Sequence, residues 1–210
     1  MKSLVNYQEI EKAYKRISNY ATRTPLLSSD LLNKEFSSNI FIKAENLQKI
    51  GAFKFRGAMN SILKLDDDKK NVLAWSSGNH AQAIASACYL TNKRATIVMP
   101  EDSPNAKLNG TKSWGADVVT FDRYSESREE IGTNLAKEIN AEIIPPFDHP
   151  DVINGQGTVG YEIINDCKNN NLVPDLVLCC CGGGGLIAGV STAIKAEYPN
   201  VPIYAVEPED

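Results

Sequence analysis

Short apolar segments alternate with helical patterns along almost the whole of the 210-residue chain, and this alternation limits the possible folds most. An apolar strand followed by a helix, repeated several times, is typical of parallel βαβ units. The pattern predicts strands at residues 39–45, 71–76, 95–100, 116–121, 141–146, 175–180 and 201–207. It predicts helices at residues 7–20, 54–65, 79–91, 105–114, 127–140, 155–167 and 185–198. The sequence therefore predicts an α/β fold built on parallel sheets.

Two polar connections divide this pattern into two lobes. The stretch LDDDKKN (65–71) has the composition of a solvated linker, and PPFDHPD (145–151) that of a stiff connection. We therefore expect a small domain at residues 69–146. Residues 1–68 and 147–210 are expected to form a large cofactor domain together.

The composition argues against several classes of function. The formal net charge is −4, which gives no basic surface for nucleic acid. No apolar run approaches the roughly 18 residues that a membrane span needs. The amino-terminal stretch MKSLVNYQEIEKAYKR lacks the apolar centre of a signal peptide. A cytoplasmic protein with no nucleic-acid or membrane partner is expected.

Three consecutive cysteines, Cys179, Cys180 and Cys181, stand out among the five in the chain. Neighbouring residues of a strand point to opposite faces, so three adjacent thiols cannot converge on one metal ion. We interpret them as small apolar side chains that fill a buried strand.

The cysteines lead directly into a run of glycines, Gly182 to Gly185, between a strand and a helix. Together these glycines cost on the order of 2–4 kcal/mol in backbone entropy unless the backbone has a special task. Close approach to an anion is such a task, because N–H groups at a helix start can bind a phosphate. The run matches neither a dinucleotide fingerprint nor a P-loop. A flexible turn is the alternative interpretation.

The stretch WSSGNHAQA also joins a strand end to a helix start, but it is rich in polar side chains. Ser76, Ser77, Asn79 and His80 can present hydroxyls, an amide and free N–H groups at one helix terminus. Such a terminus suits a carboxylate. The alternative is an ordinary helix cap by Ser77 or Asn79.

The third feature is Lys54, which stands between Phe53 and Phe55 in KIGAFKFRGA. Aromatic neighbours desolvate an ammonium, so the pKa of this lysine should fall unless a partner compensates. A desolvated lysine, a carboxylate receptor and a phosphate cradle together match pyridoxal phosphate, which carries an aldehyde, a ring and a phosphate. A salt-bridged surface lysine is the alternative.

Four motifs occur in a characteristic order: ENLQKIGAFKFRGA, SSGNHAQ, DVINGQGT and CGGGGLIAG. In this order they resemble the fold type II pyridoxal-phosphate enzymes, specifically the group of serine/threonine dehydratases, serine racemases and hydroxyaspartate ammonia-lyases. The resemblance extends over essentially the whole chain. It implies the tryptophan synthase β-subunit-like architecture with two parallel-sheet lobes.

The resemblance also implies roles for individual residues. Lys54 would bind the cofactor as an imine and act on the substrate. Phe53 would pack beside the ring and Asn79 would bond the ring hydroxyl. The phosphate would bind to four glycines, namely Gly182, Gly183, Gly184 and Gly185. The substrate carboxylate would meet one loop, formed by Ser76, Ser77, Asn79 and His80.

Three further positions match members of this group. Ser77 matches the acid/base residue of racemases on the face opposite the lysine. Arg128, in SESREE, matches an arginine that reaches the substrate in serine racemases. Glu207, in VEPED, matches a ligand of their divalent cation, Mg²⁺ or Ca²⁺.

The implied activity is that of a threonine/serine dehydratase, an ammonia-lyase that converts a small hydroxy amino acid into a 2-oxo acid and ammonia. Racemisation is a second branch of the same chemistry. Two alternatives stay open: a β-replacing synthase of the same fold, and an inactive fragment that binds only a cofactor or an anion. Proteins of this group are expected to act as homodimers when complete.

Relatives in this group are usually longer than this chain, which stops at Asp210. The large domain is therefore expected to be incomplete, without the group that faces the pyridine nitrogen and without the remaining cation ligands. A sheet cut at this point should expose an edge and apolar side chains.

Overall fold

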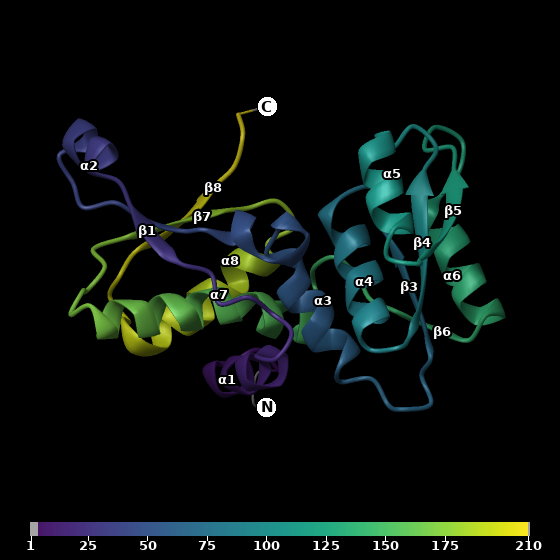
Figure 1. The fold of residues 1–210 in the computed structure, drawn as a ribbon, viewed down its shortest axis with the longest axis horizontal. Helices are drawn as coiled ribbons and strands as arrows, with labels where there is room; N and C mark the ends of the chain where they lie inside the picture. Colours follow the sequence, from purple (N-terminus) through teal and green to yellow (C-terminus); the bar gives the residue numbers. More distant parts are fainter. Residues whose placement is uncertain (1–3, 210) are drawn as a thin grey trace.

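The computed structural model describes residues 4–209 and has α/β architecture (Figure 1). Its strands form one four-stranded sheet and two separate two-stranded sheets. Residues 1–3 and 210, at the ends of the expected large domain, lie outside the described part. Figure 1 shows the four-stranded sheet with α4, α5 and α6 in one half of the molecule, and α1, α2, α7, α8 and the remaining strands in the other.

The four-stranded sheet has the order β5-β4-β3-β6, and all its strand pairs are parallel. Its strands are β3 (Asn71–Trp75), β4 (Arg94–Pro100), β5 (Asp117–Phe121) and β6 (Ala141–Ile143). They alternate with α4 (Asn79–Leu90), α5 (Asn105–Lys112) and α6 (Arg128–Glu138). Because strand side chains alternate between faces, Val72 and Ile97 pack in the core that contains α4, whereas Leu73 and Val98 pack towards α6.

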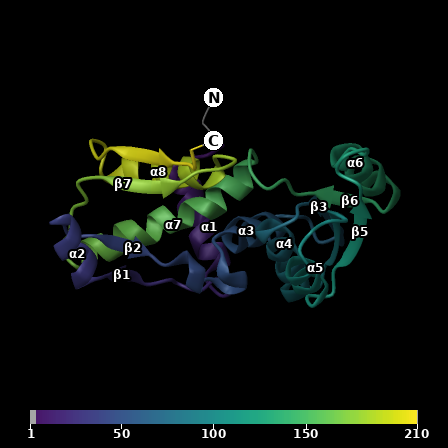
Figure 2. The ribbon, with the colours of Figure 1, turned by 90° about the horizontal axis from the view of Figure 1, so that it is seen from above.

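The other two sheets are strand pairs. β1 (Leu26–Ser28) pairs antiparallel with β2 (Phe41–Lys43) around α2 (Asp30–Phe36). β7 (Val177–Cys180) pairs in parallel with β8 (Ile203–Val206), and α8 (Gly185–Glu197) connects the two strands along the chain. Seen from above, α7 (Pro150–Asn169) runs between the two pairs (Figure 2).

Glycines let α7 approach its neighbouring helices backbone to backbone. α7 packs against α8, against α3 (Lys54–Ile62) and against α1 (Tyr7–Ile17). A Cβ atom on Gly155 would lie 2.6 Å from the Arg56 carbonyl oxygen of α3, and one on Gly189 would lie 2.4 Å from the Ile153 carbonyl oxygen of α7. Any larger residue at these positions would push the helices apart.

A buried ionic cluster fixes α3 to its surroundings. The Arg56 guanidinium is fully buried and donates to Glu45 at 2.8 Å and to Glu162 of α7 at 2.7 Å. Glu45 begins a short 3₁₀ helix, η1 (Glu45–Leu47). Lys43 of β2 contacts Glu162 at 2.8 Å and Asp166 at 3.0 Å. Hydrogen bonds to the two carboxylates raise the pKa of Arg56, although its burial acts in the opposite direction.

Several boundaries differ from the sequence-based expectation. β1 and α2 were not predicted, and the strand expected at 39–45 is shortened to Phe41–Lys43. α7 begins at Pro150 rather than at residue 155, because proline is favoured in the first turn of a helix. The cysteine interpretation is correct for Cys179, which is buried. It is wrong for Cys180, which is exposed, and for Cys181, which is only partly buried and follows the end of β7.

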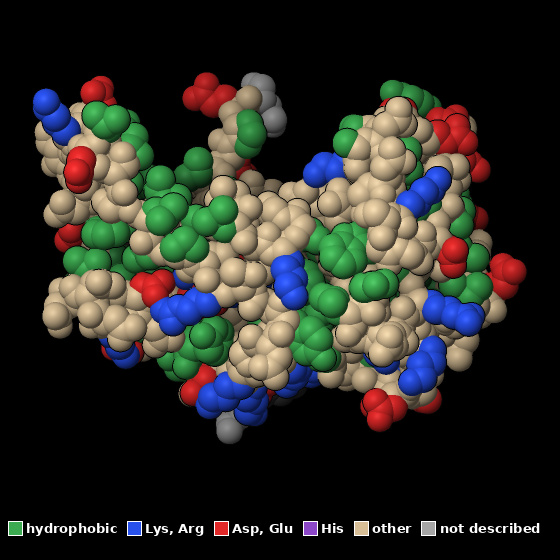
Figure 3. Space-filling model, in the orientation of Figure 1, with side chains coloured by type: hydrophobic (Ala, Val, Ile, Leu, Met, Phe, Trp, Pro, Cys, Tyr) green, Lys and Arg blue, Asp and Glu red, His purple; other side chains and the backbone are tan. Residues whose placement is uncertain are grey.

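Apolar side chains lie on the open face of the short sheets. Leu178, Tyr204 and Val206 of the β7–β8 pair are 65 %, 56 % and 48 % exposed, so no layer of the described chain covers them. Figure 3 shows further apolar side chains at the surface in the half of the molecule that contains β1 and α2. Within residues 4–209, no helix combines the length and hydropathy that crossing a membrane requires.

We expect Gly189→Ala to lower the free energy of unfolding by about 1–3 kcal/mol, because the added Cβ meets the α7 backbone. Gly110→Ala in α5 is the matched control, since its Cβ would meet only the movable end of Gln82 at 3.0 Å. That change should be neutral or stabilising by up to about 1 kcal/mol. Urea unfolding measures both. Equal stability of Gly189→Ala and the wild type would contradict the packing argument.

We expect Arg56→Met to cost about 3–5 kcal/mol of stability, because it leaves buried carboxylates without their partner. Lys15→Met, which removes an exposed ion pair with Glu11 on α1, should change stability by about 0.5 kcal/mol or less. The measurement is again urea unfolding. A loss below about 1 kcal/mol for Arg56→Met would show that water solvates the cluster.

Candidate functional site

Lys54 begins α3, and two residues separate it from the end of the short 3₁₀ helix η2 (Lys49–Gly51). In η2, Ile50 and Gly51 have φ of +61° and +70° and turn the chain sharply before the lysine. The Lys54 amine lies 5.5 Å from the centre of the Phe53 ring and donates to the Pro146 carbonyl oxygen at 2.7 Å. This partner is neutral, and burial lowers the pKa of Lys54 from its ordinary value. The amine is therefore poised to be uncharged more often than a surface lysine.

His80 is the second side chain that meets the segment before α7, residues 144–147. Its Nε2 lies 2.9 Å from the Ile144 carbonyl oxygen and therefore carries the proton that it donates. Burial is the main cause that lowers the pKa of His80 to about 4, and the charge of Lys54 adds to the effect. The ring is thus neutral near pH 7. Its buried Nδ1 has no hydrogen-bond partner within the described residues.

Phe147 connects the same segment to the glycine run. A Cβ atom on Gly183 would lie 2.1 Å from Phe147 Cδ1, so the ring packs directly on the glycine backbone. Segment 144–147 therefore contacts the amine of Lys54, the ring of His80 and the glycine run within four consecutive residues. The three sequence motifs converge on one place.

The glycine run itself has the geometry of an anion cradle. Gly184 precedes α8 with φ of +80°, and no side chain caps the helix. A Cβ atom on Gly182 or Gly184 would meet nothing within 4 Å, so the backbone faces open space on this side. The first N–H groups of α8 have no acceptor inside the helix, as at every helix start. These residues fit a phosphate group.

The serine and asparagine loop lies between β3 and α4. The cap residue of α4 is Gly78 and makes no side-chain cap, so the interpretation of Ser77 or Asn79 as an ordinary cap is wrong. Ser76 Oγ accepts from the Gly78 N–H at 3.2 Å, and Ser77 is exposed. Asn79 Oδ1 accepts from Lys107 of α5 at 2.8 Å. Hydroxyls and helix N–H groups are thus available to a carboxylate.

Arg128 and Glu207 make other contacts. Arg128 begins α6 and pairs with the neighbouring Glu129 at 2.7 Å, and both side chains are more than half exposed. Glu207 follows β8 at the surface and bonds Cys181, which raises the pKa of that thiol. Within residues 4–209 no three Asp, Glu, His or Cys side chains form a possible metal site. The substrate role of Arg128 and the cation role of Glu207 stay predictions.

Sequence reasoning missed three contributors to the site. Pro146 and Phe147 were interpreted only as part of a stiff connection, although a phenylalanine within a polar, proline-rich stretch was a signal of a packed side chain. Lys107 gave no signal, because a single lysine in a helix has the pattern of a solvated face.

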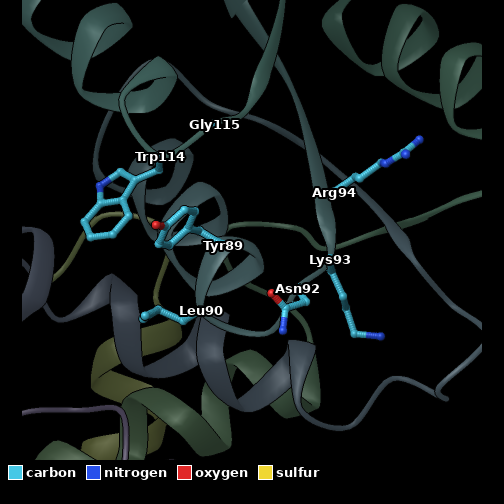
Figure 4. Close-up of a pocket in the computed structure, with 7 residues that line it drawn as sticks. All are labelled: Tyr89, Leu90, Asn92, Lys93, Arg94, Trp114 and Gly115. Atoms are coloured by element: carbon cyan, nitrogen blue, oxygen red, sulfur yellow. The ribbon is translucent and has the colours of Figure 1, made fainter.

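One surface hollow lies between the half with α2 and the half with α5, where the segment after β8 projects into it (Figure 3). The other lies beside the edge-to-face pair of Tyr89 and Trp114, whose ring centres are 5.7 Å apart (Figure 4). The second hollow contains none of the predicted site residues. Arg94 points away from its aromatic pair, and Lys93 already donates to the Lys69 carbonyl oxygen at 2.6 Å.

We expect the free energy of unfolding to fall as the pH drops from about 6.5 towards 4, since only the unfolded chain protonates His80 in this window. The loss should approach about 3 kcal/mol near pH 4. His80→Gln should remove this part of the pH dependence, whereas His149→Gln, at the other histidine of the chain, should keep it. Urea unfolding at several pH values measures the difference. Parallel curves for His80→Gln and the wild type would contradict a buried neutral ring.

The chain is similar to several known proteins along nearly its whole length. The chain is 47 % identical over 205 residues to L-threo-3-hydroxyaspartate ammonia-lyase of Saccharomyces cerevisiae, covering 97 % of this chain and 62 % of that protein. It is 43 % identical over 208 residues to serine racemase of Schizosaccharomyces pombe, covering 98 % and 63 %. The solved structure of maize serine racemase matches with a TM-score of 0.93 and 38 % identity, covering 99 % and 62 %.

This chain thus spans a little over three fifths of the length of these relatives. The structural likeness confirms the expected fold type II architecture. Residues 17–210 match the family model described as pyridoxal-phosphate dependent enzyme, and the chain therefore belongs to the family of pyridoxal-phosphate-dependent enzymes.

Proposed function

We propose that the protein is an ammonia-lyase that uses pyridoxal phosphate to remove the β-hydroxyl of a small hydroxy amino acid and yields a 2-oxo acid and ammonia. The observation that carries the proposal is the segment at residues 144–147, which contacts both the amine of Lys54 and the backbone of Gly183. The aldehyde and the phosphate belong to one small molecule, so the residues that bind them must both adjoin the same short segment. The names of similar proteins, an ammonia-lyase and a racemase among them, support the same chemistry.

The residues present fit the cofactor. The amine of Lys54 would react with the aldehyde, and the open backbone of Gly182 and Gly184 would receive the phosphate. Phe53 would lie beside the ring, and Asn79 would donate to the ring hydroxyl. When bound, pyridoxal phosphate accepts the electrons released at the Cα of an amino acid and so makes its proton acidic.

Side chains around the cofactor would accept and donate protons during the reaction. Burial lowers the pKa of Lys54, and an amine with a lower pKa can accept the Cα proton at neutral pH. Ser77 is exposed at the start of α4, where its hydroxyl could serve the opposite face and allow racemisation. The neutral ring of His80 is engaged with the Ile144 carbonyl oxygen. A substrate carboxylate would therefore be bound by the backbone N–H groups of the loop that contains His80. The His80 ring would not attract it, because the ring carries no positive charge.

The division into domains belongs to the same proposal. Residues 69–146 would form the small domain, and residues 1–68 with 147–210 the cofactor domain. The four-stranded sheet, which spans residues 71–143, supports this division. The sheet reaches segment 144–147 through the Ile144 N–H, which donates to the Leu73 carbonyl oxygen at 3.0 Å.

The proposal predicts a visible absorbance band when the purified chain is mixed with pyridoxal phosphate, because the aldehyde condenses with Lys54. L-serine, L-threonine and L-threo-3-hydroxyaspartate are then added separately. Ammonia and 2-oxo acid should appear in equal amounts with at least one of them. Lys54→Ala should abolish the band and the turnover.

Lys49→Ala is the matched control in the same stretch of sequence and should keep both signals, since Lys49 lies over Phe55 at 5.6 Å, away from Pro146. A band without ammonia from any substrate would reject the lyase reaction and leave cofactor binding. The absence of both would reject the proposal. Chiral analysis of L-serine incubations tests racemisation, which Ser77→Ala should reduce without removing the band.

A further inference from the structure

We propose that Lys107 is a positioning residue that fixes the orientation of the Asn79 side-chain amide and so determines how this amide meets the cofactor ring. This inference rests on the proposed function and deepens it. Lys107 lies on α5, twenty-eight residues along the chain from Asn79, and no sequence pattern indicates that the two meet. Their contact joins α4 and α5, two helices that alternate with the strands of the four-stranded sheet. It lies next to the loop that contains Ser76 and Ser77.

The chemistry of the contact assigns the amide orientation. The Lys107 ammonium lies 2.8 Å from Asn79 Oδ1. An ammonium can only donate hydrogen bonds, whereas an asparagine amide has an accepting oxygen on one side and a donating NH₂ on the other. The amide oxygen must therefore face Lys107. Its NH₂ group is directed away from the ammonium and remains available as a donor.

This orientation matters because the ring hydroxyl of pyridoxal phosphate presents an oxygen. An amide NH₂ group stabilises that oxygen, whereas a rotated amide would oppose it with a second acceptor and weaken binding. Lys107 makes the rotated state costly, because rotation would turn NH₂ towards the ammonium. The lysine would thus act through Asn79 without contacting the cofactor.

A structural role for Lys107 explains the contact less well. Within residues 4–209 its ammonium forms no ion pair with a carboxylate, and it bonds a neutral amide instead. Lys93, in contrast, uses its amine to close a turn through the carbonyl oxygens of Asp66 and Lys69. Lys107 is half-buried and directed to a residue at the start of α4, where the loop with Ser76 and Ser77 ends.

The test is a double-mutant cycle on the full chain, read by cofactor affinity and not by turnover. Apoprotein is titrated with pyridoxal phosphate, and its visible spectrum gives the dissociation constant. Lys107→Met should weaken binding about tenfold and give the spectrum of Asn79→Ala, and Lys107→Arg should restore affinity to within about threefold. The combined Lys107→Met/Asn79→Ala variant should bind no more weakly than Asn79→Ala alone. Lys112→Met, at the end of the same helix, should bind like the wild type.

Wild-type affinity and spectrum in Lys107→Met would overturn the inference. Additive losses in the combined variant would overturn it too, because Lys107 would then act independently of Asn79. Thermal unfolding of each apoprotein separates lost binding from lost folding, and Lys107→Arg keeps the test valid if Lys107→Met unfolds. A wild-type chain without a visible band would reject the proposed function itself, and the inference with it.

Discussion

The close approach of three helix backbones is the constraint on which the rest of the site depends. α7 lies between α3, which begins with Lys54, and α8, which begins with the last glycine of the cradle, Gly185. Gly155 removes the side chain that would separate α7 from α3, and Gly189 does the same between α7 and α8. The separation of the lysine from the cradle is therefore set by backbone contact, which varies less than a contact between flexible side chains. A site for a ligand of fixed length needs such a fixed separation.

The ionic cluster explains how Lys54 can remain without a carboxylate partner two residues away from a buried arginine. Side chains two positions apart on a helix point to different faces. Arg56 therefore faces Glu45 and Glu162, while Lys54 faces the neutral carbonyl of Pro146. Arg56 and Lys43 neutralise Glu45 and Glu162, and within residues 4–209 no carboxylate forms an ion pair with the Lys54 amine. Burial then governs the pKa of this amine.

Much of this arrangement could be predicted from the sequence, because strands and helix starts follow local rules. The alternation of apolar runs predicted every strand of the four-stranded sheet, and the glycine run predicted an open helix start. The start of α7 at Pro150 was missed because the prolines of PPFDHPD (145–151) were interpreted as a stiff connection, although a proline is also favoured in the first turn of a helix. Lys107 could not be found, since it matters only through Asn79, a residue distant in sequence. Phe147 carried the signal of a packed side chain, but the sequence does not indicate that its ring packs on Gly183.

Segment 144–147 shows how the two halves of the molecule, which also share a core across α3 and α4, can contribute to one site. On one side Ile144 extends the four-stranded sheet, because its N–H donates to the Leu73 carbonyl oxygen at 3.0 Å and its own carbonyl accepts from His80. On the other side, Pro146 accepts from Lys54 and Phe147 packs on Gly183. Its two prolines and the two carbonyl contacts leave this short stretch little freedom. A shift of the sheet relative to α3 would have to break the contact with His80 or the contact with Lys54, so this segment couples the carboxylate loop to the lysine and the cradle.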